Sequence, residues 1–595
     1  MDSIIMTNDK LRMTTNSYKE KLSEATQQYL KLTKQYNQIS FLRLAEMLLI
    51  IWSVYKLIKA PSVVMGLFCM LTIVVFLLLI VKHKKISALR SIAQTKIRLN
   101  EQEIAFLEQH TFFTDNGKDF QEENHPYAYD LDILGEHSLY HYLNRTHTFL
   151  GKKLLAKRLL SPSSEDIINT QEQIKALTPD LSWRQTFTAY AQQIDDSKDF
   201  YIKLRTWASS TVKLLSKTMQ YTLIVLPIFL IISLLIGYGN DNELLKSVGK
   251  LLITVNLLLF FSFIGKMTKE KLGFERTYTM LYAFKECIAQ VEARFPEKNK
   301  QASTKIAQLS RLLDDLDNVS NILVSIPLNL FSFYHVHRYQ QLLQWKAQYA
   351  SCIEEWLESV GETEVLCSFA NFSYNNPEFV YPTLNNDYEI AFEAVGHPLI
   401  PSEHRITNDI TLGEHAFVLL TGSNMSGKST FLRTLGVNML LTLVGLPVCA
   451  RKANVHPLRL LVSMRLADSL NDGKSYFFAE INRIQQIMET LEGERCFVLL
   501  DEVLRGTNSE DKQYGTIKII ERLLSLQALG VLATHDIEVC KLTEQYPHQL
   551  QNKCFESDIT NGELTFDYKL REGVCQNKNA TFLMKKLGII EDRND

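Results

Sequence analysis

The chain has 595 residues, which is too long for one domain and indicates roughly three or four at about 150 residues each. Hydrophobic residues make up 46% of it and charged residues 22%, and the formal net charge of −2 lacks the basic excess of dedicated DNA-binding proteins. The nine cysteines include no C-x-x-C pair, which argues against a disulfide framework or a zinc site and indicates reduced thiols in the cytosol.

The first 40 residues are polar, so no secretory signal peptide is predicted, and residues 1–43 are expected to form a cytosolic helical stalk. Residues 86–108 are again polar and helical in pattern, with one apolar side. The two segments are predicted either to pair as a stalk hairpin or to stand as two independent amphipathic helices. The first has the 3-4-3-4-3 spacing of a heptad seam at Leu22, Ala25, Tyr29, Leu32, Tyr36 and Ile39.

Two uncharged stretches in the N-terminal half are long enough to cross a lipid bilayer. One lies between Lys59 and Lys82, and the other lies between Lys217 and Asp241. About 20 apolar residues suffice for a helix that spans the hydrocarbon layer. We therefore predict that both stretches are transmembrane helices.

Each long stretch has a shorter apolar neighbour, at residues 44–58 and 251–265. Charged groups near the end of a helix can extend to the lipid headgroups, so these neighbours can also span. Pairing them with the long stretches predicts two transmembrane hairpins, which turn at Lys59-Ala60-Pro61 and around Gly239–Asn242. The alternative is two spans only, which would place the middle of the chain on the other side of the membrane.

Positive charge flanks the outer ends of both predicted hairpins, and lysine and arginine stay on the inner side of a membrane. We therefore expect a multi-pass protein of the cell (inner) membrane whose soluble parts are cytoplasmic. The flanking residues are Lys31, Lys34, Arg43, Lys82, Lys84, Lys85, Arg90, Lys213, Lys217, Lys266, Lys269 and Lys271.

The C-terminal third contains a P-loop (Walker A) pattern, G-x4-G-K-S, between an apolar strand at 416–420 and a helical pattern at 430–443. Its glycines let the backbone N–H groups face phosphates, and the helix N-terminus adds a positive dipole end. Lys428 is expected at the β- and γ-phosphates of ATP, and the Ser429 hydroxyl at Mg²⁺. The predicted nucleotide-binding residues are Gly422, Ser423, Asn424, Met425, Ser426, Gly427, Lys428, Ser429 and Thr430.

Two later strands end in polar residues suited to ATP hydrolysis. The strand at 496–500 runs into Asp501, the expected Mg²⁺ ligand, and Glu502, the expected base or orienting group for the attacking water. The strand at 530–534 is followed by His535. Ligands of open α/β sheets bind at the carboxyl ends of the strands, so His535 is predicted to sense the γ-phosphate.

These motifs occur in the order of the ATPase domain of the MutS family, which the chain resembles closely over residues 360–590 and loosely over 130–200. The carrying segments are TGSNMSGKST, RLADSLNDGKSYFFAEINRI, CFVLLDEVLRGTNSED and LATHDIEV, with GHPLI at 396–400 resembling the entry to that domain. The segment at 139–177 resembles the start of the family's core or lever domain.

The resemblance implies an α/β P-loop domain of the ABC type at the C-terminus, preceded by an all-α lever and core into which the hairpins are inserted. It also implies ATP and Mg²⁺ as cofactors and a homodimer with composite sites through the ATPase domains. The expected division of the chain is 1–43 stalk, 44–81 hairpin, 82–130 linker, 131–217 core, 218–265 hairpin, 266–385 lever and 386–595 ATPase domain.

Further residue roles follow from the resemblance. That of Ser475 also has support from its position after Gly473 and before a helical pattern, where its hydroxyl could bind an anion, with an ordinary helix N-cap as the alternative. Asn424 is implied to contact the nucleotide and assist catalysis together with Lys428, Glu502 and His535. Ser475 is implied to reach the nucleotide of the partner protomer, and 505–508 (RGTN) to join the two sites.

The sequence departs from the family at its N-terminus, where the mismatch-reading module is expected to be missing. The one Phe-x-Glu motif, Phe106-Leu-Glu108, lies in a helical run and is interpreted as chance. A basic run is interpreted as a solvated helix face, with phosphate contact as the alternative, at Lys152, Lys153, Lys157 and Arg158.

Three functions are compatible with these features. The first is a membrane-anchored, dimeric ATP-driven switch that binds mismatched or branched DNA in repair or recombination. The second is the same switch acting on a protein partner without DNA, with the lipid bilayer as its anchor in both cases. The third, an ABC-type transporter, is disfavoured because the spans carry few polar groups for a substrate path.

Overall fold

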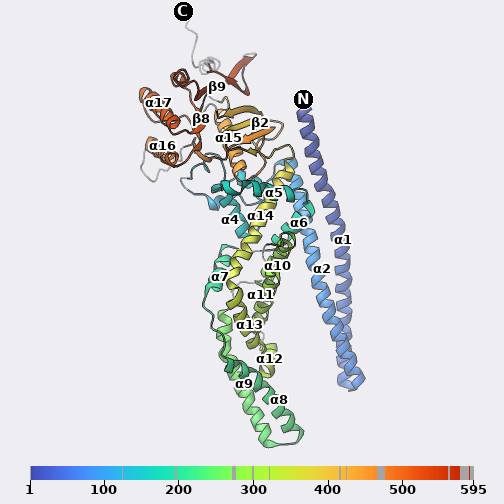
Figure 1. The fold of residues 1–595 in the computed structure, drawn as a ribbon. Coiled ribbons are helices and arrows are strands. Elements are labelled where there is room, and N and C mark those ends of the chain that lie inside the picture. The colour runs from blue at the N-terminus through green and yellow to red at the C-terminus, as the bar shows by residue number, and fades with distance from the viewer. Residues whose placement is uncertain are drawn as a thin grey trace, which may run out of the picture.

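The computed structural model describes residues 2–122, 125–194, 197–270, 277–297, 300–320, 322–413, 417–423, 425–465, 476–560, 563–575 and 589. The molecule is elongated, with a head of two β-sheets at one end and the tips of two helical hairpins at the other (Figure 1). The helical N-terminal part followed by a mixed α/β head agrees with the expected fold class.

The first hairpin is formed by α1 (Asp2–Lys59) and α2 (Val63–Gln109), which pack along each other and run from the level of the head toward the opposite end (Figure 1). Ala25 and Ile39 of the predicted seam are buried, and its other four positions are half-buried. The stalk-hairpin alternative and the predicted turn are therefore confirmed. The expected boundaries at residues 43 and 82 lie inside these two continuous helices.

The second hairpin consists of α8 (Lys217–Gly239) and α9 (Glu243–Lys269), and it turns where the sequence predicts. Three described helices are long and apolar enough to cross a membrane by length and composition, namely α2, α8 and α9. The expected span at residues 44–58 is part of α1, which is not among these three helices.

The remaining helices form the body between the hairpins and the head. The central one, α14 (Ile353–Asn375), is buried over most of its length and leads directly into the head. The others are α3 (Leu139–Leu143), α4 (Phe149–Leu160), α5 (Ile167–Leu177), α6 (Leu181–Ala191), α7 (Lys198–Ser209), α10 (Thr277–Arg294), α11 (Ala302–Asp317), α12 (Ile322–Ser332) and α13 (Tyr334–Tyr349). Short 3-10 turns lie at Lys118–Phe120, Ser164–Asp166, Asn318–Ser320 and Ala350–Cys352.

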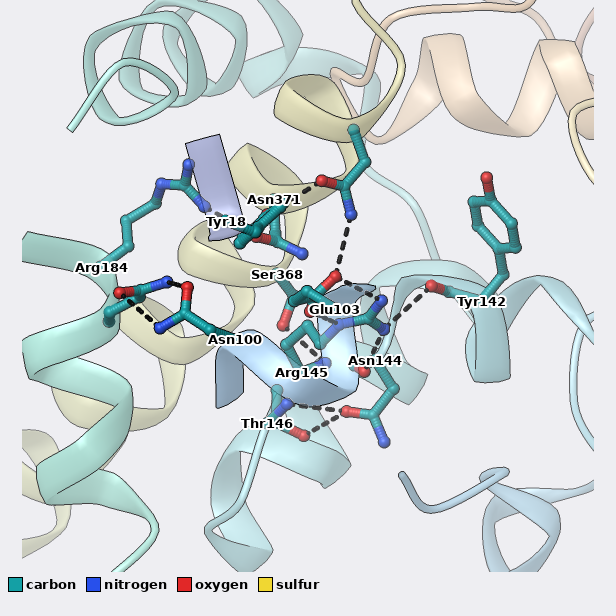
Figure 2. Close-up of polar contacts among 12 residues, drawn as sticks. Tyr18, Asn100, Glu103, Tyr142, Asn144, Arg145, Thr146, Arg184, Ser368 and Asn371 are labelled. Carbon is teal, nitrogen blue, oxygen red and sulfur yellow. Dashed lines mark hydrogen bonds and ion pairs between the residues drawn. The ribbon is translucent and has the colours of Figure 1, made fainter. Parts of the chain in front are cut away.

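A buried polar network fastens the stalk hairpin to α14 (Figure 2). The Tyr18 hydroxyl of α1 lies 3.0 Å from Asn371 Oδ1 and 2.9 Å from Asn375 Oδ1, and its single proton is shared between these two acceptors. Glu103 of α2 forms an ion pair with Arg145, whose Nη2 lies 3.3 Å from Glu103 Oε2, and Asn375 Nδ2 donates to the same carboxylate at 3.0 Å. Burial alone would raise the pKa of Glu103, but the charge and hydrogen bonds of Arg145 outweigh it and lower that pKa.

The larger sheet of the head has the strand order β10-β9-β4-β8-β7-β6, parallel throughout except for the antiparallel β9–β10 pair. Its strands are β4 (Phe417–Gly422), β6 (Arg459–Ser463), β7 (Cys496–Asp501), β8 (Leu529–Ala533), β9 (Leu550–Thr560) and β10 (Glu563–Glu572). A smaller sheet, of order β1-β5-β2-β3, comprises Thr383–Leu384, Lys452–Val455, Ile390–Val395 and Asn408–Leu412.

Helices cover both faces of the larger sheet, which explains why its central strands are apolar at nearly every position. α15 (Lys428–Leu443) packs on the face that carries Val418 and Leu420, and α16 (Tyr476–Gly493) and α17 (Ser509–Ser525) pack on the other face. Two short helices follow β8, at Ile537–Cys540 (α18) and Leu542–Gln545 (α19). Because β4, β7 and β8 are parallel neighbours, their carboxyl ends meet at one edge.

Candidate nucleotide site

The glycine-rich loop connects the end of β4 to the start of α15, as the sequence predicts. Gly427 has φ of 100°, a left-handed conformation that favours glycine, and an added Cβ at Gly422 would lie 2.5 Å from Ser426 Oγ. Within the described chain, the Ser423 and Ser426 hydroxyls are buried without a protein partner. Buried unpaired donors at the mouth of a loop suit an acceptor-rich ligand such as a phosphate group.

Lys428, the first residue of α15, curls back over this loop. Its Nζ donates to the carbonyl oxygens of Gly422 at 2.8 Å and Ser423 at 3.0 Å, and the residue is buried. Burial lowers the pKa of Lys428, while the nearby carboxylates of Glu502 and Asp501 act in the opposite direction. The ammonium group therefore lies where it can exchange its hydrogen bonds to the loop carbonyls for hydrogen bonds to phosphate oxygens.

The Ser429 hydroxyl donates to Asp501 Oδ2 at 2.6 Å, which brings together the two predicted Mg²⁺ ligands. Among the described residues, no group of three or more His, Cys, Asp or Glu side chains could hold a metal by itself. The Ser429 hydroxyl and the Asp501 carboxylate together suit Mg²⁺, which is usually bound through one or two protein oxygens together with substrate phosphates and water. The pair would hold the ion against the phosphates, where it would neutralise their charge.

Glu502 lies beside this pair in a left-handed backbone conformation, with φ of 52°. Its Oε1 is 2.7 Å from His535 Nε2, and its Oε2 is 3.5 Å from Arg505 Nε. The hydrogen bond from His535 lowers the pKa of Glu502 to about 2, against the opposing effect of burial. Because the one Nε2 proton goes to Glu502, the 3.2 Å approach of Lys428 Nζ to the same nitrogen is a close contact and not a second hydrogen bond.

A cavity of about 420 Å³ extends from the loop toward the smaller sheet and β10. Its far side combines apolar and aromatic side chains with a few polar groups, a combination typical of small-molecule sites. Burial lowers the pKa of His397 to about 4, so its ring is neutral at pH 7. The lining on that side includes Val395, His397, Ile400, His404, Ile406, Asn408, Phe555 and Tyr568.

This cavity brings most of the predicted site residues together. Those lining it are Met425, Ser426, Gly427, Lys428, Ser429, Thr430, Asp501, Glu502 and His535. Gly422 and Ser423 do not line the cavity, but their carbonyl oxygens accept hydrogen bonds from Lys428 Nζ, which does. Asn424 and Ser475 fall outside the described residues.

Comparison with known proteins agrees with this geometry, since residues 418–588 match the family model for MutS domain V. The C-terminal region carries a MutS domain V. The DNA mismatch repair protein MutS of Thermotoga petrophila is 32% identical over 241 residues, which are 39% of this chain and 29% of that protein. MutS of Borrelia hermsii is 24% identical over 512 residues, 77% of this chain and 58% of that protein.

A eukaryotic relative matches similarly: the DNA mismatch repair protein MSH4 of Arabidopsis thaliana is 31% identical over 244 residues, 38% of this chain and 31% of that protein. The chain thus spans between about a third and three fifths of the length of these relatives. The MutS domain V begins inside β4 and includes the loop, Asp501, Glu502 and His535.

Several residues of the site in the MutS domain V and beside it have no role in the sequence-based prediction. His397 belongs to the GHPLI segment but was assigned no contact, and His404, Asn408 and Tyr568 were not singled out. Asn408 Nδ2 donates to the carbonyl oxygen of Tyr568 at 3.0 Å, which ties β3 to β10 across the cavity. The only available signal was the proximity of these segments to matched family motifs.

Proposed function

We propose that this protein is a membrane-anchored MutS-like ATPase that hydrolyses ATP with Mg²⁺ and works as a homodimer. The observation that carries the enzymatic part is the meeting of Lys428, the Ser429–Asp501 pair and the Glu502–His535 pair at one sheet edge. Lys428 would bind the β- and γ-phosphates, and Glu502 would accept a proton from the attacking water. The match to MutS domain V supports this assignment.

Membrane anchoring is supported by an apolar belt on the second hairpin, which we define as the exposed apolar side chains of α8 and α9. On α8 it runs from Tyr221 to Tyr238, about 26 Å at 1.5 Å per residue, close to the roughly 30 Å of a bilayer core. Its members are Tyr221, Ile224, Val225, Ile228, Phe229, Ile231, Ile232, Leu235, Ile236, Tyr238, Leu244, Leu251, Val255, Leu258 and Phe261.

The ends of the belt have the chemistry of a membrane–water interface. Tyrosine, which is enriched at such interfaces, occupies both ends on α8. Near the hairpin tip, the long side chains of Lys246 and Lys250 can reach the headgroups. The opposite end, toward the head, carries the exposed lysines Lys213, Lys217, Lys266 and Lys269.

The first hairpin supports the same arrangement, since its tip lies at the same end of the molecule as that of α8–α9 (Figure 1). Exposed apolar residues cover both of its helices from Leu44 to Val81, and the exposed Lys82, Lys84 and Lys85 follow on the side of the head. With lysines on the inner side, we propose a multi-pass protein of the inner membrane with four spans and a cytoplasmic head.

The ATP cycle would be transmitted through α14, which joins the head to the body and holds the stalk hairpin. The relatives named DNA mismatch repair proteins favour mismatched or branched DNA as the ligand of this switch. The net charge of −2 favours the alternative, a protein partner without DNA. The basic run on α4 favours neither alternative: Lys152 Nζ lies 3.9 Å from Asp115, and the other three side chains are exposed, as both a solvated face and a phosphate-contacting face would be.

One experiment separates the two alternatives. The full chain is purified in detergent, and ATP hydrolysis is measured with no DNA and with duplex, mismatched or branched DNA at increasing salt. If DNA is the ligand, it changes the rate and its affinity falls steeply with salt because phosphate contacts release counterions. A rate that is insensitive to all three DNAs favours the protein partner, and absence of Mg²⁺-dependent hydrolysis overturns the proposal.

A second prediction concerns nucleotide affinity. Lys428→Ala removes charge-assisted hydrogen bonds, each worth about 1.5–3 kcal/mol, so ATP should bind roughly 10- to 100-fold more weakly. A fluorescent nucleotide titration with Mg²⁺ measures the change. Lys518→Ala, which removes an exposed lysine on α17 paired with Glu521, serves as the control and should bind normally. Equal affinities for both variants would contradict the site.

A further inference from the structure

The short helix α12, which lies between α11 and α13 in the chain, is unusually apolar and packs on the second hairpin. The sequence from 318 to 337, between Asp317 and Arg338, contains no charged residue with histidine neutral. Its helical part, α12, contacts both α8 and α9. At 11 residues α12 is too short to span a bilayer, because about 20 are needed.

The depth of α12 along the hairpin follows from hydrogen bonding and register. The buried Asn256 side chain of α9 donates to the carbonyl oxygen of Leu330 at 3.0 Å. Because Gly237 faces Lys246 and Gly249 faces Leu234, Asn256 lies level with Pro227 on α8. Pro227 is six residues beyond Tyr221, so the end of α12 lies about 9 Å inside the apolar belt.

The polar side chains of α12 whose surroundings are described are satisfied inside the protein. Ser325 Oγ donates to the Val319 carbonyl at 2.8 Å, and Ser332 Oγ to the Leu328 carbonyl at 2.6 Å. Asn329 Nδ2 donates to the Ser325 carbonyl at 2.7 Å, and Asn329 Oδ1 accepts from the His335 backbone N–H at 3.0 Å. Such internal pairing is what a hydrocarbon environment requires, since lipid offers no hydrogen bonds.

The described exposed side chains of α12 are apolar except for Ser332, whose hydroxyl is hydrogen-bonded within the helix. Leu328 is 39% exposed and Phe331 is 44% exposed, and Pro327 lies beside them on the surface. Helices that lie in the membrane interface insert their apolar face about 5–10 Å into the boundary of headgroups and acyl chains. The depth of α12 agrees with that range.

We propose that α12 inserts into the cytoplasmic leaflet beside α8 and α9 and contacts lipid acyl chains through Leu328 and Phe331. This inference rests on the proposed anchoring of the second hairpin and extends it to a third element of the body. Since α12 connects α11 to α13, the body then contacts the membrane through α12 as well as through the hairpin α8–α9.

The test uses the full chain reconstituted into phosphatidylcholine vesicles, with a fluorophore attached at Phe331→Cys or, separately, at Leu328→Cys. None of the nine native cysteines is exposed, and the labelled unchanged chain gives the background. Quenching by lipids with brominated acyl chains is compared with quenching by aqueous iodide. Ile232→Cys within the apolar belt is the membrane control, and Ile202→Cys, 48% exposed on α7, is the aqueous control.

We expect brominated lipids to quench the labels at 331 and 328 as they quench the label at 232, and iodide to quench only the label at 202. If the label at 232 responds to lipid while those at 331 and 328 respond to iodide or to neither quencher, the inference about α12 is overturned and the anchoring stands. If the label at 232 responds to iodide and not to lipid, both are overturned.

Discussion

Glu502→Gln is expected to reduce steady-state ATP hydrolysis by about 10²- to 10⁴-fold, the contribution typical of a positioned general base, while ATP binding is retained. The amide keeps the size of the side chain but cannot accept the proton of the attacking water. Because the pKa of Glu502 is about 2, the carboxylate is ionised throughout the pH range of an ordinary assay. Phosphate release measures turnover, and the nucleotide titration measures binding.

The Glu502 side chain is held in place beside the candidate nucleotide site. The side chain is held by His535 on one side and Arg505 on the other, next to Asp501 and the loop. Glu538→Gln, which neutralises an exposed carboxylate of α18 paired with Lys541, is the matched control and should hydrolyse ATP normally. Full hydrolysis by Glu502→Gln would show that another group activates the water.

The meeting of the candidate site residues could be predicted from sequence because each part is encoded locally. The G-x4-G-K-S pattern after an apolar strand predicts Lys428 and Ser429 at a helix start, and a buried strand followed by Asp501 and Glu502 places two carboxylates at a strand end. Parallel strands then bring such ends to one edge without further information. His535 was placed by the same rule, and it lies 2.7 Å from Glu502.

The other side of the cavity could not be predicted in this way. His397 precedes β3, and Tyr568 is in β10, about 170 positions later, so their meeting depends on how the smaller sheet packs against the larger one. No periodicity or spacing reports such a contact. Only the resemblance to the family marked the GHPLI segment that contains His397, and it assigned no role to that side chain.

The helical half shows the same division between local and long-range information. The heptad seam and the apolar stretches predicted helices, and the positions of both hairpin turns were correct. The pairing of Tyr18 with Asn371 joins residues 353 positions apart through polar groups, which sequence patterns assign to the surface. α12 was missed as a separate element because its apolar run is shorter than a membrane span.

Arg145→Ala is expected to destabilise the docking of the stalk hairpin by about 3–5 kcal/mol, the cost of leaving a buried carboxylate without its partner. Glu103 is 8% exposed and has its only ion pair, within the described residues, with Arg145. Since the pKa of Glu103 is lowered in the folded protein, this stabilisation is present above the ordinary carboxyl pKa and is lost as the pH falls through the lowered value. Hydrogen exchange of α1 and thermal unfolding in detergent measure the change.

A second variant separates the loss of the pair from the general disturbance of the network. Combining Arg145→Ala with Glu103→Gln removes the unpaired charge, so the double variant should be more stable than Arg145→Ala alone. Arg205→Ala, which breaks the exposed pair with Glu354, should cost less than about 1 kcal/mol. If the Arg145→Ala and Arg205→Ala variants have the same unfolding temperature and the same hydrogen exchange in α1, the stalk hairpin is held by its Tyr18 contacts and apolar packing. The Glu103–Arg145 ion pair then does not determine where the stalk hairpin docks.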